Sequence, residues 1–114
     1  MSEPDRGAAL IWCPFDTCEN AVAAVRQLVA EDLVACANII GEVTSVFRYE
    51  GEIEEAREYG VLLKTTHDLL EPACARLSEL HPYETPAIAG WHADRAPAET
   101  LRWLAESLPR RSPE

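Results

Sequence analysis

The feature that most constrains the fold is a turn signal, Glu50-Gly51, which separates two long strand-forming segments. The first comprises Ile39-Ile40 and residues 43–49, which are rich in β-branched and aromatic side chains, and Gly41 between them marks an expected bulge. The second covers residues 53–66. The centre of the chain is therefore predicted to be an antiparallel hairpin that is long for a domain of 114 residues.

A strand and a helix are predicted before this hairpin. The short apolar run at residues 8–12 forms a strand that ends at Cys13-Pro14, and Asp16 with Glu19 forms a capping box that begins a helix. Apolar residues recur along that helix at spacings of three and four, which places them on one face: Ala21, Val25, Leu28, Val29 and Leu33.

A helix, a strand and a last helix are predicted after the hairpin. The second helix covers residues 68–80, with Pro72 within about its first turn, where a missing N–H costs little. Residues 85–93 then form a fourth strand, and a short helix begins near Pro97 and stops at Pro109. The order is β-α-β-β-α-β with an extra C-terminal helix, which is the α+β arrangement of a ferredoxin-like fold.

Length and charge limit the class of protein. We expect one domain over residues 8–109, between a disordered tail at residues 1–7 and a frayed tail at residues 110–114. The 10 basic residues against 20 acidic residues give a net charge of −10, which argues against nucleic acid or an anionic membrane as partner. No apolar run approaches the roughly 18–20 residues that span a bilayer, and the polar N-terminus lacks signal-peptide features, so we expect a cytoplasmic protein.

The segment His81-Pro82-Tyr83-Glu84-Thr85-Pro86 places an imidazole, a phenol and a carboxylate within four positions. Each proline fixes its own φ and pushes the residue before it out of the helical region, so His81 and Thr85 are expected to be extended. A backbone held this firmly around polar side chains favours a preorganised site over a flexible linker. His81 is therefore the best histidine candidate for a ligand, whereas His67 and His92, near element ends, are most simply solvated.

Four cysteines lie on segments expected to be regular structure, and in a reducing compartment they would be free thiols. Cys13 and Cys18 bracket the first loop, where ferredoxin-like metal carriers hold soft metals, usually with two residues between the ligands; here there are four. The alternative is that Cys13 ends a buried strand and Cys18 fills the first helical turn, and Cys36 and Cys74 are expected to be structural. A thiolate and an imidazole suit copper or zinc, but one of each is not a complete site.

A run of glutamates surrounds the predicted hairpin tip. We expect it to be a solvated face that also prevents wrong strand pairing, in preference to a cation site: Glu50, Glu52, Glu54, Glu55 and Glu58.

Signatures of catalysis are few. The sequence has no nucleophile elbow, no phosphate-binding glycine loop and no His-Glu-x-x-His motif. The first loop also lacks the arginine and glycines that acylphosphatase-like chemistry on this fold would use. Cys13 and His81 are a conceivable nucleophile pair, but no third group is available to orient them. We therefore do not expect an enzyme.

Four segments together resemble the CutA family of divalent-cation tolerance proteins, from about residue 9 to residue 108. They read LVACANII at residues 33–40, VTSVFRYEG at 43–51, LKT at 63–65 and HPYETP at 81–86, the last being the most specific. The resemblance implies a ferredoxin-like fold assembled as a tight homotrimer, similar to the PII signalling proteins, with hairpins that extend the sheets between subunits. It also implies a part in tolerance to divalent metals, copper most often, without established catalysis.

The same resemblance implies site residues. By position, the family's proposed metal site falls on Cys13 and His81. Leu80 stands where a second histidine can precede the signature, so Glu84 or a group from a neighbouring subunit would have to replace that ligand. Tyr49 stands where tryptophan is usual, and we expect it at the subunit interface together with Tyr83. The predicted cofactor is copper, with zinc and other divalent cations as alternatives.

Three interpretations stay open at this point. The first is a cytoplasmic homotrimer that binds copper or a divalent ion at Cys13 and His81 and contributes to metal tolerance. The second is a PII-like signalling or interaction module, whose intersubunit cleft near Tyr83 and Glu84 binds a small molecule or an unidentified partner protein. In the third, residues 81–86 serve only to join helix to strand, with Tyr83 packed at the interface.

Overall fold

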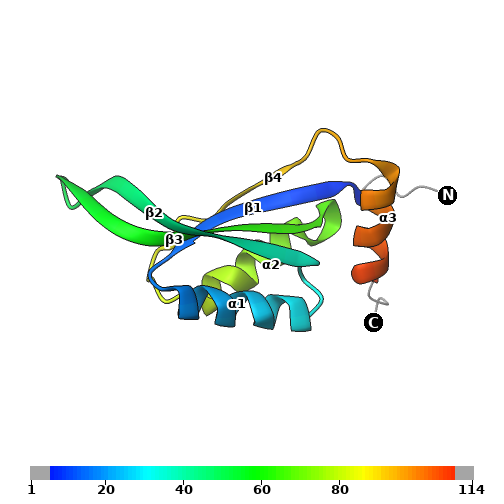
Figure 1. The fold of residues 1–114 in the computed structure, drawn as a ribbon, viewed down its shortest axis with the longest axis horizontal. Helices are drawn as coiled ribbons and strands as arrows, with labels where there is room; N and C mark the ends of the chain where they lie inside the picture. The colour runs from blue at the N-terminus through cyan, green and yellow to red at the C-terminus, as the bar shows by residue number, and fades with distance from the viewer. Residues whose placement is uncertain (1–5, 110–114) are drawn as a thin grey trace.

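The computed structural model describes residues 6–109. Its elements follow the order β1 (Ala8–Phe15), α1 (Cys18–Ala30), β2 (Cys36–Tyr49), β3 (Glu52–Thr66), α2 (His67–Leu80), β4 (Ala89–His92) and α3 (Ala98–Ser107). The four strands form one antiparallel sheet in the order β2-β3-β1-β4, and α1 and α2 lie on the same side of it (Figure 1). This confirms the predicted ferredoxin-like β-α-β-β-α-β fold with an extra C-terminal helix.

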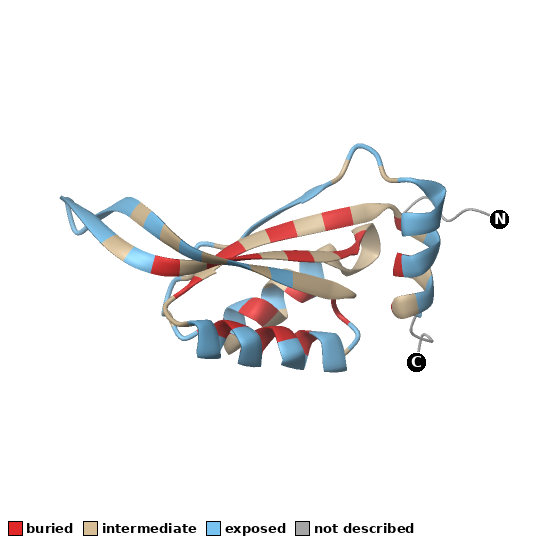
Figure 2. Ribbon diagram, in the orientation of Figure 1, coloured by how far each residue is buried: buried red, intermediate tan, exposed pale blue. Residues whose placement is uncertain are grey.

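The core lies between the sheet and the two helices. Every second residue of β1 is buried, because successive strand side chains point to opposite faces: Ala9, Ile11, Cys13 and Phe15. The inner face of α1 supplies Ala21, Ala24, Val25 and Leu28 to the same cluster. In Figure 2, red bands recur along both β1 and α1. Val29, which was predicted on this face, is 40% exposed. Separately, none of the helices within residues 6–109 is both long and apolar enough to cross a bilayer.

The central hairpin has the turn and the bulge that its sequence predicts. Glu50 and Gly51 both have positive φ, 50° and 83°, as a two-residue turn with the right-handed strand twist requires. Gly41 has φ of 121° and sits where the register between β2 and β3 shifts, which is the expected bulge. Beyond Gly41 the hairpin extends away from the body, and its distal part is exposed (Figures 1 and 2).

Three local predictions were wrong in detail. Thr17, and not Asp16, caps α1: its Oγ1 accepts a hydrogen bond from the Asn20 amide at 3.0 Å, while Asp16 accepts from the amide of Thr17 at 2.8 Å. Pro72 lies inside α2 beyond the first turn. The fourth strand covers only Ala89–His92, since continuing its register would place residue 87 opposite Pro14, which has no N–H to donate.

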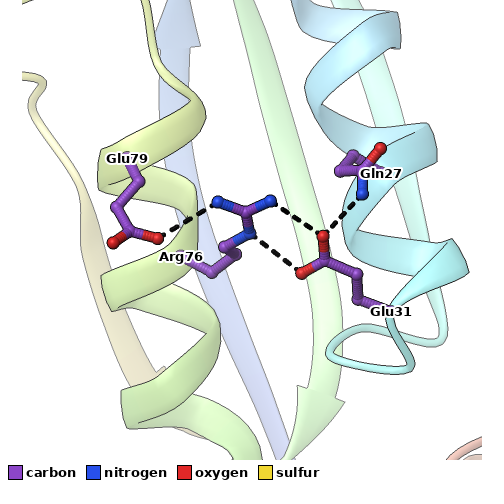
Figure 3. A network of polar contacts seen from close by, with 4 residues as sticks. All are labelled: Gln27, Glu31, Arg76 and Glu79. Atoms are coloured by element: carbon purple, nitrogen blue, oxygen red, sulfur yellow. Dashed lines mark hydrogen bonds and ion pairs between the residues drawn. The ribbon is translucent and has the colours of Figure 1, made fainter.

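Polar contacts join the helices across their exposed sides. Arg76 of α2 donates through Nε and Nη2 to the two carboxylate oxygens of Glu31 after α1, each at 2.9 Å, and through Nη1 to Glu79 at 3.2 Å (Figure 3). Gln27 of α1 donates to the same Glu31 carboxylate. These side chains remain partly solvated, so the network fixes the relative orientation of α1 and α2 more than it adds stability.

Arg6 corrects the expectation of a disordered tail over residues 1–7. Its side chain is buried, and it donates to the carbonyl of Leu108 at 2.6 Å, to Thr66 Oγ1 at 3.2 Å and to Asp68 at 3.2 Å. It therefore ties the C-terminal end of α3 to the start of α2. Residues 1–5 and 110–114, the remainder of both predicted tails, lie outside the described part of the chain.

Replacing Arg6 tests this connection. Arg6→Ala removes two buried hydrogen bonds and the part-buried contact with Asp68, and it leaves the carbonyl of Leu108 without this donor, so the free energy of unfolding should fall by about 2–4 kcal/mol. Arg57→Ala is the matched control, because its ion pair with Glu42 is solvated on both sides and should contribute less than about 0.5 kcal/mol. Denaturant unfolding measures both, and equal losses would contradict the role given to Arg6.

Candidate functional site

His81 is the first residue after α2 and has an extended backbone, with φ of −74° and ψ of 141°, as the following proline predicts. The side chain is buried, and both ring nitrogens have partners. Nε2 lies 2.8 Å from the carbonyl oxygen of Pro14, and Nδ1 accepts a hydrogen bond from the amide of Tyr83 at 3.1 Å. Because Nδ1 accepts, the ring proton lies on Nε2 and is donated to Pro14.

Aromatic contacts fix the same ring. The imidazole of His81 stacks on Phe15 with centroids 4.2 Å apart, and the ring of Tyr83 lies 4.7 Å away at a tilted angle. His81 thus joins the end of β1, the end of α2 and the start of the proline-bounded loop. Both of its ring nitrogens are used in hydrogen bonds that hold these segments together.

Cys13 is fully buried on the side of β1 that faces the helices. Burial, and secondarily the charge of Glu58 and the nearby Cys74, raise the pKa of its thiol to about 12. At neutral pH Cys13 is therefore a thiol, whereas a soft metal binds the thiolate. Cys18 is exposed at the start of α1, so the structure does not bring the two cysteines of the first loop together on one surface.

These observations decide how well the predicted metal ligands fit copper or zinc. Glu84 lies on the exposed loop, His81 has no free lone pair, and Cys13 is protonated and enclosed in the core. Among residues 6–109, no group of three or more His, Cys, Asp or Glu side chains is placed to hold a metal ion. Cys13, His81 and Glu84 therefore do not form a metal site in this protomer, and copper does not fit them.

The residue that sequence reasoning missed is Glu58. We expected it in the solvated glutamate run, but it is only 8% exposed, and its Oε2 accepts a hydrogen bond from the Tyr83 hydroxyl at 2.7 Å. Burial and then the Glu58 carboxylate raise the pKa of Tyr83, which keeps the phenol protonated as the donor. The available signal was its position: Glu58 is the member of the run that adjoins the buried part of β3.

Glu58 and Tyr83 line the largest of the three cavities that we describe, a cleft of about 780 Å³. One wall is the outer part of the hairpin, and the other is the loop after His81. The cleft is lined by both walls and by the end of β1: Pro14, Ser45, Phe47, Arg48, Tyr49, Ala56, Glu58, Tyr83, Glu84, Thr85 and Ala87. A cavity of this size, with aromatic walls and a few converging polar groups, has the character of a small-molecule site.

Of the other two histidines, His92 is exposed, as predicted, whereas His67 is partly buried and is not simply solvated. His67 and His92 stack with centroids 3.7 Å apart and planes 13° from parallel. The backbone of Gly7 lies against the His67 ring, where a Cβ would be 2.6 Å from Cε1, and His67 Nε2 is buried without a hydrogen-bond partner among the described residues. Near-parallel rings do not direct their lone pairs toward a common point, so this pair does not suit a metal ion either.

The raised pKa of Cys13 gives a pH prediction. The folded thiol ionises near pH 12 and the unfolded thiol near its ordinary 9.0, so above pH 9 the unfolded chain binds fewer protons. The free energy of unfolding should then fall as pH rises from about 9 toward about 12, by up to about 1.4 kcal/mol per pH unit for this group, with Tyr83 acting in the same direction.

Guanidinium unfolding at several pH values measures this dependence. Cys13→Ala should flatten it, whatever its effect on stability at neutral pH. Cys18→Ala, which removes an exposed thiol, is the matched control and should leave the dependence unchanged. A Cys13→Ala variant with the slope of the original protein would refute this account.

Comparison with known proteins is consistent with this architecture. Residues 9–107 match the family model described as "CutA1 divalent ion tolerance protein". The divalent-cation tolerance protein CutA of Pyrococcus horikoshii is 40% identical over 97 residues, which are 85% of this chain and 94% of that protein. The crystal structure of CutA1 from Ehrlichia chaffeensis superposes with a TM-score of 0.86 at 33% identity, covering 91% of this chain and 97% of that one.

A further structure, from Archaeoglobus fulgidus, is described as a periplasmic divalent cation tolerance protein CutA. It superposes with a TM-score of 0.84 at 29% identity, covering 89% of this chain and 98% of that one. The match to the family spans both walls of the cleft, the hairpin and the HPYETP segment. The chain belongs to the CutA1 family of divalent ion tolerance proteins.

Proposed function

We propose that this protein contributes to the tolerance of divalent cations as a homotrimer, without catalysing a reaction. The observation that carries the proposal is its membership of a divalent ion tolerance family over nearly the whole described chain. Copper as the particular ion stays a prediction, and the geometry of Cys13 and His81 does not support them as its ligands.

The apolar surface of the protomer supports assembly. On the side of the sheet away from the helices, Leu10, Trp12 and Leu62 are only half-buried, and Trp12 packs over Gly60, where a Cβ would be 2.4 Å from its ring. On the hairpin, Val46 and Ile53 are 65% and 71% exposed. Apolar surface of this extent on a small domain is typical of an interface between subunits.

The two predicted interface tyrosines differ in their surroundings. Tyr49, near the hairpin tip, is 60% exposed, which suits a side chain covered by a neighbouring subunit. Tyr83 is half-buried by its own protomer, through Glu58 and His81. We therefore propose Tyr49, which also lines the cleft, as an interface residue, and Tyr83 as a cleft residue held by its own protomer.

The four cysteines support a cytoplasmic location. Cys13, Cys18, Cys36 and Cys74 are all free thiols, which is the state that a reducing compartment maintains.

The cleft supports a second candidate function, a PII-like module that binds a small molecule. Its volume of about 780 Å³ and its buried carboxylate, Glu58, favour a ligand that enters between the hairpin and the loop.

One pair of variants tests the trimer and the tolerance role together. Val46→Ser/Ile53→Ser removes two exposed apolar side chains that, by the register of the hairpin, lie on the face opposite Phe47. Burial of such side chains contributes about 1.5–3 kcal/mol each, so the concentration at which the trimer dissociates should rise at least about tenfold. Trp103→Ser, on α3, removes an exposed apolar side chain elsewhere and should leave the trimer intact.

Analytical ultracentrifugation measures the assembly. Growth of cells that lack this gene, in increasing concentrations of copper and zinc salts, measures the function. Tolerance should be restored by the original protein and by Trp103→Ser, and restored less well by the double variant. A monomer at all concentrations would refute the trimer, and unaltered growth of the deletion strain would refute the tolerance role.

A further inference from the structure

We propose that the cleft between the hairpin and the loop after His81 binds an organic ammonium ion, with Glu58 as its counter-ion and Phe47 and Tyr83 as aromatic walls. This inference rests on the small-molecule function proposed above and names the chemical class of the ligand. It follows from the charge, the aromatic lining and the hydrogen bonding of the cleft.

The first argument concerns the buried carboxylate. Glu58 is 8% exposed, and its single hydrogen bond among the described residues is the one from Tyr83 to Oε2. No lysine, arginine or histidine within residues 6–109 forms an ion pair with it. Taking a carboxylate out of water is costly unless a cation or several donors accompany it, so a cation that enters the cleft would complete its surroundings.

The second argument concerns the aromatic side chains. The register of the hairpin pairs Val43 with Glu58 and Phe47 with Glu54, so Phe47 and Glu58 lie on the same face. Phe47 is 41% exposed and lines the cleft, as does the half-buried Tyr83. The negative face of an aromatic ring attracts an organic cation, and aromatic side chains are a recurrent means of binding quaternary ammonium groups.

The third argument concerns the sign of the charge. The lining contains two carboxylates, Glu58 and Glu84, against one guanidinium, that of Arg48. Arg48 donates to the carbonyl of Gly51 at 3.3 Å, which directs it toward the hairpin turn. The cleft is therefore net negative within a chain of net charge −10, and this field attracts cations and repels anions.

The donor set separates an organic cation from a metal ion. Two carboxylates and a phenol kept protonated by its raised pKa supply too few ligands for a divalent ion, which in proteins usually takes six or more oxygens or four nitrogen and sulfur ligands. Phe47 offers no ligand atom at all. An ammonium group needs only one counter-ion and aromatic contact, which this cleft provides.

Choline, its neutral isostere 3,3-dimethylbutan-1-ol and the small anion acetate are the three probes. Their binding to the assembled protein is followed by calorimetry and by amide NMR shifts at Tyr83 and Glu84. Choline should bind and the alcohol should bind at least about tenfold more weakly, because only the cation gains from Glu58 and the rings. Glu58→Gln keeps an acceptor for Tyr83 and should weaken choline binding about tenfold. Phe47→Ala should weaken it about threefold.

The matched control is Glu55→Gln, an exposed carboxylate of the same strand whose register places it on the opposite face; choline binding should be unchanged. Equal affinity of Glu58→Gln and the original protein, or of choline and the alcohol, would overturn the inference. Acetate or the alcohol as the preferred probe would overturn the ammonium assignment while the cleft remained a ligand site. If none of the three probes binds, this inference is overturned and the small-molecule function is weakened. The trimer and tolerance measurements do not depend on any of these outcomes.

Discussion

The imidazole of His81, hydrogen-bonded through both nitrogens, is the interaction on which the site depends. It holds the carbonyl of Pro14 at the end of β1 and the amide of Tyr83 after α2. The prolines on each side of this segment reduce the number of backbone conformations available, so little entropy opposes the arrangement. Tyr83 is thereby placed to donate to Glu58, and the cleft acquires its buried carboxylate.

Local patterns predicted the order of the elements because each pattern reports its own segment. The turn at Glu50-Gly51 and the bulge at Gly41 require backbone conformations that their residues favour, and both are present. The predictions that failed depend on contacts distant in sequence. Arg6 is ordered by Thr66, Asp68 and Leu108, and β4 is shortened by its register against Pro14.

The candidate site shows the same division between what local sequence predicts and what depends on contacts distant in sequence. Residue type and position identified Cys13, His81 and Tyr83 as candidates, and the resemblance to the CutA family assigned Cys13 and His81 to one metal site. Neither source shows whether a lone pair is free or a thiol is buried, because these depend on packing. Cys13 resembles a ligand in sequence but is a core residue in the fold, while Glu58 resembles a solvated residue and is buried.

The central claim is that His81 positions the cleft and is not a metal ligand, and ¹⁵N NMR of its labelled imidazole tests this most directly. The account predicts the tautomer protonated at Nε2, with Nδ1 as acceptor, and no change of the His81 resonances when zinc or copper(I) is added. A proton on Nδ1 of His81, or a shift of either His81 nitrogen on metal addition, would contradict it.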